Sequence, residues 1–139
     1  MGKVVFLDID GVLRRKRGPQ AIEPERAKLV HDFAQNRGIN LVISSTWRLA
    51  YELSFFQRTI SPKVVGKLPG DAKACELDER DRGRLIRIVA EKKLTGHTWA
   101  TLDDDPSLFP SKRDSDRCVF VNSDYLVTEA DLNKLDNLL

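Results

Sequence analysis

Two aspartates near the N-terminus have the residue type and the spacing for cation chemistry. Asp8 and Asp10 follow the apolar residues 4–7, and Gly11 comes directly after them. Four consecutive apolar residues are typical of a buried strand, and on an extended backbone residues two positions apart point to the same side. The two carboxylates therefore leave the strand end together and repel each other. A divalent cation resolves this repulsion, and hard oxygen ligands favour Mg²⁺.

Polar residues also follow two later apolar segments. Residues 39–43 are followed by Ser44 and Ser45, and residues 98–102 are followed by the acidic run Asp103 to Asp105. Three apolar strands that each deliver acids or hydroxyls at their C-terminal ends are what an open parallel α/β sheet needs for a site at its switch point. We therefore expect these polar residues to meet at one edge of a parallel sheet.

Between these strands, most of the chain has apolar residues at the spacing of an amphipathic helix. Helices are predicted over residues 25–37, 49–60 and 80–93, with a last helix opened by the capping box 128–131. The aromatic residues of 49–60 are interpreted as core rather than as a platform for base stacking. Leu85, Ile88 and Val89 are the expected buried stripe of the third helix. Residues 118–121 read as a further strand, and 71–81 and 107–117 as loops.

Composition and length describe an ordinary globular protein. The 139 residues suit one domain, and 41% hydrophobic with 32% charged residues is typical of soluble proteins. A net charge of +2 is too small to argue for nucleic-acid binding by itself. Cys75 and Cys118 show no metal-like spacing, so we interpret them as thiols in a reducing compartment. Without a signal-peptide pattern or an apolar run of about 20 residues, we expect a cytoplasmic protein that does not bind membranes.

The polar strand ends match the motifs of a known superfamily. Phe6-Leu7-Asp8-Ile9-Asp10-Gly11-Val12 resembles motif I (hhhDxDGxx) of the haloacid dehalogenase-like (HAD) phosphohydrolases. Ile39 to Ser44 resembles motif II, hhhhh(S/T), and Thr98 to Asp104 resembles motif IV, hhhhDD. The resemblance implies a Rossmann-like three-layer α/β/α fold with a central parallel sheet, in a single domain over residues 1–139. Neither usual insertion point has room for a cap domain.

A subgroup of these phosphohydrolases is especially similar. Ser44-Ser45-Thr46-Trp47-Arg48, with the Phe-Leu-Asp-Ile-Asp-Gly-Val-Leu and Leu-Asp-Asp-Asp runs, looks like the small capless HAD group associated with RNA-repair proteins. That group is related to the 3′-phosphatase domain of polynucleotide kinases. The resemblance therefore implies a phosphatase that uses Mg²⁺.

The resemblance also implies roles for the acids. Asp8 is the expected nucleophile and forms an aspartyl-phosphate, and Asp10 is the general acid and base. Mg²⁺ would be held by Asp8, the backbone carbonyl of Asp10 and Asp104. Asp103 would support this ligand set or hold the basic residue of motif III. Because a halide leaving group needs no general acid, Asp10 favours phosphoryl transfer over dehalogenation.

A hydroxyl and a cation are expected to stabilise the phosphoryl oxygens. Ser44, the first hydroxyl after its strand, is the expected donor, and Ser45 could take its place. Arg82 is the expected motif III residue, since Arg82-Gly83 stands where the related sequences carry a basic residue at or near the start of this helix. Three other basic residues compete for this role: Lys73, Arg80 and Arg84.

A capless site stays open and suits a large substrate. The basic cluster Arg14 to Arg17 follows the acids and would attract a polyanion, so a phosphorylated nucleic-acid end is the favoured substrate. Arg14, Arg15, Ser45 and Arg48 are the expected substrate contacts. A phosphatase on phosphoproteins or small phosphoesters, and a non-catalytic module that binds metal or phosphate, remain alternatives. The sequence leaves the oligomeric state open.

Overall fold

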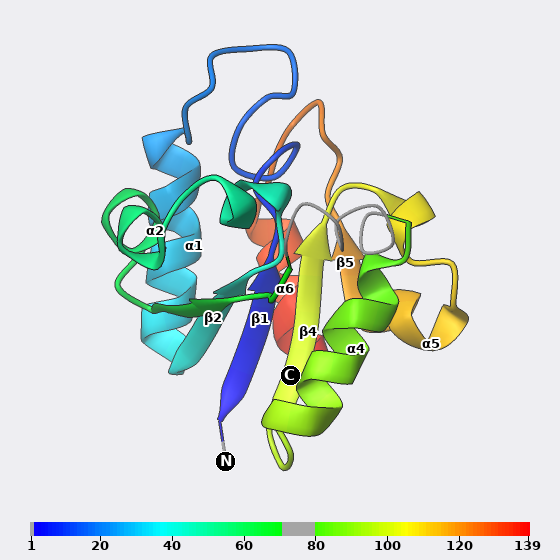
Figure 1. Cartoon of the computed structure of the whole chain (residues 1–139). Helices are drawn as coiled ribbons and strands as arrows, with labels where there is room; N and C mark the ends of the chain where they lie inside the picture. The colour runs from blue at the N-terminus through cyan, green and yellow to red at the C-terminus, as the bar shows by residue number, and fades with distance from the viewer. Residues whose placement is uncertain (1, 71–79) are drawn as a thin grey trace.

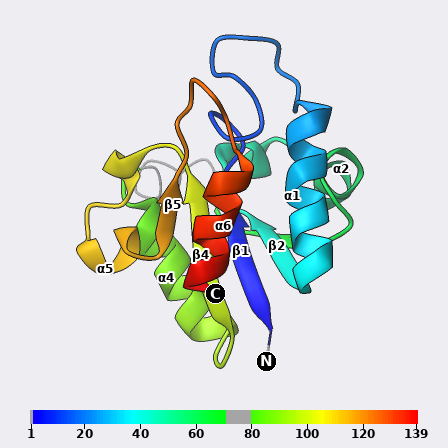
Figure 2. The same cartoon turned by 180° about the vertical axis from the view of Figure 1, so that it is seen from behind.

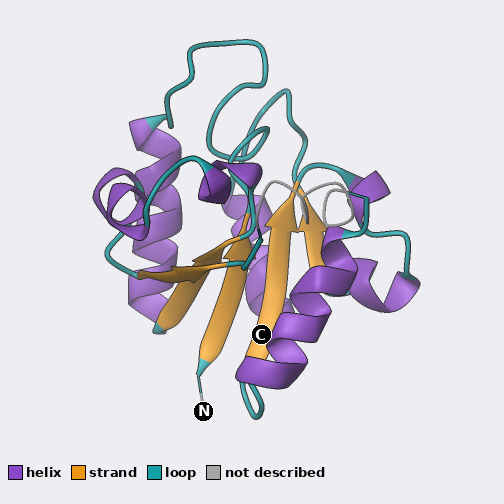
Figure 3. Cartoon of the chain, in the orientation of Figure 1, coloured by secondary structure: helices purple, strands orange, loops and turns teal. Residues whose placement is uncertain are grey.

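A five-stranded parallel sheet forms the centre of the molecule (Figures 1 and 3). The computed structural model describes residues 2–70 and 80–139. The strand order is β3-β2-β1-β4-β5. Their bounds are β1 Lys3–Leu7, β2 Ile39–Ile43, β3 Val64–Lys67, β4 Thr98–Asp103 and β5 Cys118–Phe120. The predicted central parallel sheet is thus confirmed.

Strand β1 lies in the middle of the sheet, between β2 and β4. Its last residue, Leu7, is level with Ile43 of β2 and Leu102 of β4. The backbone N–H of Asp8 donates to the Leu102 carbonyl at 3.0 Å, and that of Ser44 donates to the Leu7 carbonyl at 3.0 Å. This register brings the polar residues after the three strands to one edge, where the order of strands reverses.

Helices cover both faces of the sheet, which gives three layers (Figures 1 and 2). Alternation along β1 sends Val5 and Leu7 to the face covered by α1 and α6, and Val4 and Phe6 to the face covered by α4. The α-helices are α1 Pro24–Arg37, α2 Leu53–Thr59, α4 Arg82–Lys93, α5 Lys112–Ser115 and α6 Glu129–Leu138. Short 3₁₀ helices occupy η1 Thr46–Leu49 and η2 Pro106–Leu108.

Helix boundaries at the two ends of the chain follow the sequence signals. α1 begins at Pro24 and stops at Gly38, whose φ of 63° is in the left-handed region. The predicted capping box of α6 is formed, because the Thr128 hydroxyl accepts from the Asp131 N–H and the Asp131 carboxylate accepts from the Thr128 N–H. No helix in the described ranges has the length and apolarity to cross a bilayer.

The predicted helix 49–60 is wrong over its first four residues. η1 ends at Leu49 and α2 starts only at Leu53. The Lys67 ammonium donates to the Arg48 and Tyr51 carbonyls at 2.9 Å each, so these two carbonyls of the connecting segment are bound outside a helix. Within α2 only Phe56 is buried, while Phe55 is half-buried and Tyr51, which precedes the helix, is 39% exposed. The aromatic residues of this segment are therefore only partly core.

Two further expectations need correction. The buried face of α4 carries Ile86 and Ala90, with Leu85 and Val89 beside them, whereas Ile88 belongs to neither core cluster. Segment 107–117 is not simply a loop, since it contains part of η2 and all of α5. Residues 71–79 of the other expected loop lie outside the described residues.

Insertion points for a cap domain are short in the described chain. The segment 8–23 between β1 and α1 contains no helix or strand. It rises as a loop above the C-terminal ends of the strands, beside the loop 121–128 (Figure 1). The capless α/β fold that the motif spacing predicts is confirmed.

Candidate active site

Carboxylates gather at the C-terminal ends of β1 and β4. Asp8, Asp103 and Asp104 each offer an oxygen atom, and these three atoms lie within 4.8 Å of one another. Asp8 is 4% exposed and Asp103 is fully buried. Residues separated by about ninety-five positions in the sequence are thus brought together, as the strand-end pattern predicts.

Gly11 makes room for one of these acids. Its φ of +79° is a conformation that residues with a side chain rarely adopt. A Cβ at Gly11 would stand 2.5 Å from the Asp104 Cγ atom, which is closer than non-bonded atoms can approach. The glycine of motif I is therefore needed both for the turn after β1 and for the close approach of Asp104.

Arg82 is the cation at the floor of the site. Its Nη1 atom lies 2.8 Å from Asp103 Oδ2 and 3.1 Å from Asp8 Oδ1, and the arginine is only 5% exposed. Among its competitors, Arg80 and Arg84 are exposed, and Lys73 lies outside the described residues. Arg82 therefore has the contacts that a motif III residue needs.

The N-terminus of α4 is held so that this arginine reaches the acids. Arg82 is the first residue of α4, and the Asp81 carboxylate caps the helix by accepting from the Arg84 N–H. A Cβ at Gly83 would stand 2.7 Å from Phe109 Cδ2 and 2.9 Å from Asp114 Cβ. The absence of a side chain at Gly83 thus lets the first turn of α4 pack tightly beside the site.

Electrostatics at the floor favour an additional positive charge. Burial, followed by the negative charge of Asp103, raises the pKa of Asp8 well above its usual range, although Arg82 acts in the opposite direction. Burial also raises the pKa of Asp103, again against Arg82. A divalent cation beside these carboxylates would offset their repulsion, and a donor set made only of oxygen fits Mg²⁺. The residues present therefore fit the expected cofactor.

Asp103 fulfils both roles that the sequence left open. Its Oδ2 atom accepts from Arg82, while its Oδ1 atom accepts from the backbone N–H groups of Asp104 at 2.8 Å and Asp105 at 3.0 Å. One carboxylate thus fixes the motif III arginine and the turn that carries Asp104. Asp103 is best described as the residue that positions its neighbours.

Asp10 lies at the rim, where two side chains hold one of its carboxylate oxygens. Its Oδ1 atom accepts from Arg14 Nη1 at 2.6 Å and from Trp47 Nε1 at 3.1 Å. Neither Oδ2 nor the Asp10 carbonyl accepts a hydrogen bond from any residue that the structure describes. The carbonyl could therefore serve as a metal ligand and Oδ2 could exchange a proton with a substrate.

The basic loop after motif I is arranged differently from the expected open rim. Arg14 is only 5% exposed and, besides Asp10, contacts the carbonyls of Gly18 and Pro19. Arg15 is exposed and donates to the Asp124 carbonyl at 2.7 Å. The expectation that Arg14 faces substrate is therefore not supported, because its guanidinium instead fixes Asp10 and the loop.

Lys16 is the member of that loop that reaches Asp104. Its Nζ atom lies 2.7 Å from Asp104 Oδ2, although half of the lysine side chain is exposed. This hydrogen bond raises the pKa of Lys16. The sequence interpretation placed Lys16 in the basic cluster without assigning it a contact, because only the path of the loop decides which of four neighbouring cations turns inward.

An open pocket of about 170 Å³, which we call the acidic pocket, lies above these carboxylates and cations. Its lining residues are Asp8, Asp10, Lys16, Ser45, Thr46, Arg82, Asp104, Asp105 and Leu108. Ser44 is not among them, and its buried hydroxyl has no partner in the described part of the chain. The Ser45 hydroxyl accepts from the Trp47 N–H at 3.2 Å and keeps its own proton for a ligand. Pocket geometry thus favours Ser45 over Ser44 as the hydroxyl donor.

Arg48 lies beneath the serine turn rather than in the pocket. It is 3% exposed, and its Nη1 atom donates to the Ser44 carbonyl at 3.2 Å and the Ser45 carbonyl at 3.3 Å. The expected direct contact between Arg48 and substrate is therefore not supported. Its position favours a role in holding the turn that presents Ser45.

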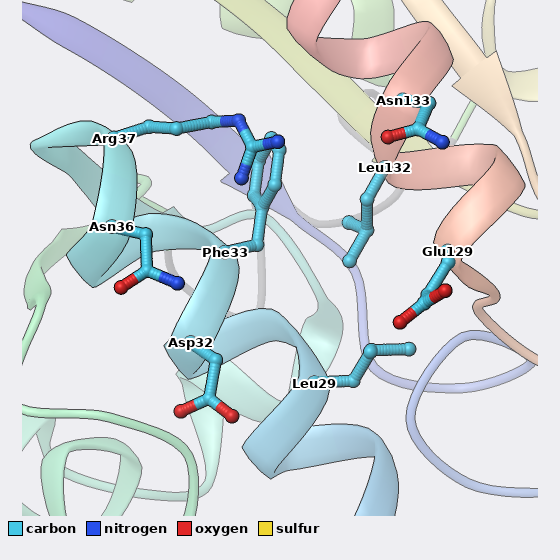
Figure 4. Close-up of a pocket in the computed structure, with 8 residues that line it drawn as sticks. All are labelled: Leu29, Asp32, Phe33, Asn36, Arg37, Glu129, Leu132 and Asn133. Carbon is cyan, nitrogen blue, oxygen red and sulfur yellow. The ribbon is translucent and has the colours of Figure 1, made fainter.

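A separate groove lies between α1 and α6 (Figure 4). Leu29 and Phe33 of α1 line it together with Leu132 of α6, and charged side chains such as Asp32 and Glu129 stand around them. It shares no lining residue with the acidic pocket. Within the described residues, the metal-type cluster of acids is confined to the acidic pocket.

Comparison with protein families identifies the chain. The family model described as "HAD domain in Swiss Army Knife RNA repair proteins" matches residues 4–132. The chain belongs to this family. Searches of curated proteins and of solved structures gave no match. All the site residues described above lie within the matched span, and membership supports a phosphohydrolase-like role.

Proposed function

We propose that this chain is a Mg²⁺-dependent phosphomonoester hydrolase that works through an aspartyl-phosphate on Asp8. The observation that carries the proposal is the juxtaposition of Asp8 with Asp103, Asp104 and Arg82 on the floor of an open pocket. A carboxylate held beside cations, and open to a ligand on one side, is suited to attack an anionic phosphoryl group. Family membership supports the same class of chemistry.

Each chemical step has a residue in reach of the pocket. An Asp8 oxygen attacks phosphorus, forming the Asp8–phosphorus bond as the bond to the alcohol oxygen breaks. Asp10 gives its proton to the departing oxygen and then takes a proton from the water that attacks phosphorus. This second attack releases inorganic phosphate and restores the Asp8 carboxylate. The Ser45 hydroxyl and Arg82 hold the phosphoryl oxygens during both steps.

The cation has a defined place in this scheme. Asp8, the Asp10 carbonyl and Asp104 would hold Mg²⁺, which when bound neutralises charge on the nucleophile and the phosphoryl group. Asp103 remains with Arg82 and the Asp104 turn. In this scheme the Asp103 carboxylate has a structural role, and the Asp8 and Asp104 carboxylates would bind the metal.

A phosphorylated nucleic-acid end is the proposed substrate. The capless pocket is open, and Arg15, Lys16 and Arg17 line a hollow of about 470 Å³ directly beside it. Cations at the mouth of a site attract a polyanion and make its binding dependent on salt. The description of the family, which names RNA repair, supports the same substrate class. Phosphoproteins and small phosphoesters are the competing substrates.

A substrate panel tests the function. Inorganic phosphate release is measured with 3′- and 5′-phosphorylated oligonucleotides, mononucleotides, a phosphopeptide and an aryl phosphate, with Mg²⁺ or with a chelator. The wild-type chain is compared with Asp8→Asn and Asp10→Asn. Asp116→Asn is the matched control, because Asp116 is 59% exposed and pairs only with Lys112 in the described structure.

We expect Mg²⁺-dependent turnover by the wild-type chain and by Asp116→Asn. Asp8→Asn and Asp10→Asn should have lost this turnover. Fastest turnover on oligonucleotide ends, falling steeply with salt, would support the nucleic-acid substrate. A preference for the phosphopeptide or aryl phosphate, with little effect of salt, would assign the enzyme to the competing class. Metal binding without turnover on any phosphoester would instead identify a non-catalytic domain.

A further inference from the structure

A second pocket adjoins the acidic pocket on the side of Asp10. Its volume is about 440 Å³, which is within the range of small-molecule sites. It lies between the loop that precedes α1 and the segment η1–α2. Its lining residues are Gln20, Ala21, Ile22, Pro24, Trp47, Phe55, Arg58 and Thr59. We call it the aromatic pocket.

Trp47 connects the two pockets. Its indole Nε1 atom donates to Asp10 Oδ1 at 3.1 Å, and the same side chain forms a wall of the aromatic pocket. Phe55 provides the second aromatic wall, with its ring centroid 6.2 Å from that of Trp47 and an interplanar angle of 23°. Tyr51 stacks on both rings, with its centroid 4.2 Å from that of Phe55 and 5.2 Å from that of Trp47. The aromatic pocket therefore begins one side chain away from the proposed general acid.

The position of Asp10 indicates where the leaving group must lie. A residue that protonates the departing oxygen must be within hydrogen-bond reach of it, so the alcohol part of the substrate sits beside Asp10. Within the described residues, two side chains donate to the Asp10 carboxylate, namely Arg14 and Trp47. Arg14 also donates to the Gly18 and Pro19 carbonyls of its own loop, whereas Trp47 lines the aromatic pocket, so a leaving group beside Asp10 is directed toward that pocket.

We propose that the aromatic pocket binds the terminal nucleobase of the phosphorylated nucleic-acid end, an inference that rests on the proposed function. Bases stack on aromatic side chains irrespective of sequence, and Trp47 with Phe55 offers such walls. Gln20 and Thr59 supply polar groups for a base edge, and the Arg58 guanidinium can pack against a ring. A phosphorylated serine side chain has no ring at this distance from its phosphate.

Two further hollows link the aromatic pocket to the basic loop through shared lining residues. Ala21, Ile22 and Pro24 also line a hollow of about 330 Å³, and Arg15 is another of its lining residues. Arg15 in turn lines the basic hollow beside Lys16. A strand with its last base against Trp47 can therefore follow these hollows with its phosphates near Arg15, which a mononucleotide cannot do.

The test compares matched substrates with and without the terminal base. Oligonucleotides phosphorylated at the 3′ or the 5′ end are prepared with a normal or an abasic terminal nucleotide, and kcat/KM is measured with Mg²⁺. Removal of the base should lower kcat/KM of the wild-type chain roughly 10- to 100-fold, which is the size of one base–aromatic stack. The phosphoryl group and the backbone charge are unchanged in this comparison.

Variants at Phe55 assign the effect to the pocket. Phe55→Leu keeps an apolar side chain without a ring and should reduce the ratio of kcat/KM between the normal and the abasic end to less than about threefold. Phe55→Tyr keeps the ring and should keep the preference. Phe33→Leu is the matched control, because Phe33 is a ring of α1 that belongs to the separate α1–α6 groove.

A binding measurement separates this inference from the proposed function. Replacing Trp99 by Phe leaves Trp47 as the sole tryptophan of the chain, which has two. A nucleoside 3′-monophosphate should quench its fluorescence, whereas ribose phosphate should not, and Phe55→Leu should weaken the quenching. Base-selective quenching without turnover would support base binding in the aromatic pocket and contradict the proposed phosphatase activity. Turnover with equal rates on normal and abasic ends would support the phosphatase activity and contradict base binding in the aromatic pocket.

Discussion

The floor and the rim of the acidic pocket are built in contrasting ways. On the floor, Asp8, Asp103 and Arg82 have side chains at most 6% exposed, and they come from regular elements or the residue directly after one. On the rim, Asp10 is 36% exposed and Lys16 is 50% exposed, and both lie in the loop before α1. The floor is thus a buried set of interdependent charges, whereas the rim is a solvated set.

This difference determines how strongly each region should respond to mutation. Removing one partner of a buried ion pair leaves the other charge without water or a counterion, which is costly. An exposed ion pair contributes little to stability, because water and salt replace either partner. Floor substitutions should therefore affect folding and catalysis together, while rim substitutions should change substrate binding or turnover with little effect on folding.

Loss of Arg82 should have the largest effect. Arg82→Ala leaves two buried carboxylates without their cation, so we expect about 3–5 kcal/mol of destabilisation. We also expect at least roughly a 100-fold loss of kcat, because a preorganised donor to the phosphoryl oxygens is removed. Urea unfolding and phosphate release measure the two effects.

Controls on the same helix sharpen this test. Arg84→Ala, at an exposed position of α4, should change both quantities little. Arg82→Lys keeps the charge but not the guanidinium fork, so it should recover part of the stability and less of the rate. Equal stability of Arg82→Ala and Arg84→Ala would contradict the description of the floor as a buried ion-pair set.

Gly11 offers the next test, with a matched partner in Gly38. Both glycines have positive φ, at +79° and +63°, so alanine should cost each position about 1–2 kcal/mol of backbone strain. A Cβ at Gly38 meets nothing within 4 Å, whereas at Gly11 it collides with the Asp104 carboxylate. Gly11→Ala should therefore also lose Mg²⁺ binding and turnover, and Gly38→Ala should keep both. Isothermal titration with Mg²⁺ distinguishes the two variants.

Metal binding itself should raise the melting temperature. A cation that binds only the folded state adds about 2.7 kcal/mol of stability at a hundred times its Kd. We expect Mg²⁺ to raise the Tm of the wild-type chain and of Asp105→Asn. It should not change the Tm of Asp104→Asn. Asp105 is the matched control because its carboxylate accepts from Ser107 and lies outside the three-acid cluster. Equal shifts in all three proteins would reject the proposed ligand set.

The same contrast explains what the sequence could predict. Strand-end residues such as Asp8 and Asp103 follow from the hydrophobic pattern, because parallel strands fix where their C-terminal ends lie. Arg82 was found through family resemblance and its place before a helix. The register of these elements is set by the core, so motif spacing and spatial position agree there.

Rim residues were harder to predict because a loop sets their direction. Arg14 and Lys16 are both basic and two positions apart, yet one is buried against Asp10 and the other contacts Asp104. The choice between Ser44 and Ser45 depends on a rotation of the turn after β2, which neighbouring hydroxyls do not reveal. The aromatic pocket was missed because the sequence interpretation assigned all the aromatic residues of 49–60 to the core.

Substitution of Lys16 should have the smallest effect on stability and activity, as expected for a residue of the exposed rim. Lys16→Gln removes an ion pair that is half exposed, so the free energy of unfolding should change by no more than about 1 kcal/mol. KM for an oligonucleotide end should rise several-fold with little change in kcat, and the dependence of KM on salt should weaken, because one cation fewer meets the phosphates. Lys28→Gln, which breaks an exposed pair with Asp32 on α1, is the control and should leave KM and its salt dependence unchanged. A large fall in kcat in Lys16→Gln would instead place this lysine among the groups that act on the reacting phosphoryl group, and the boundary between floor and rim would have to move outward to include it.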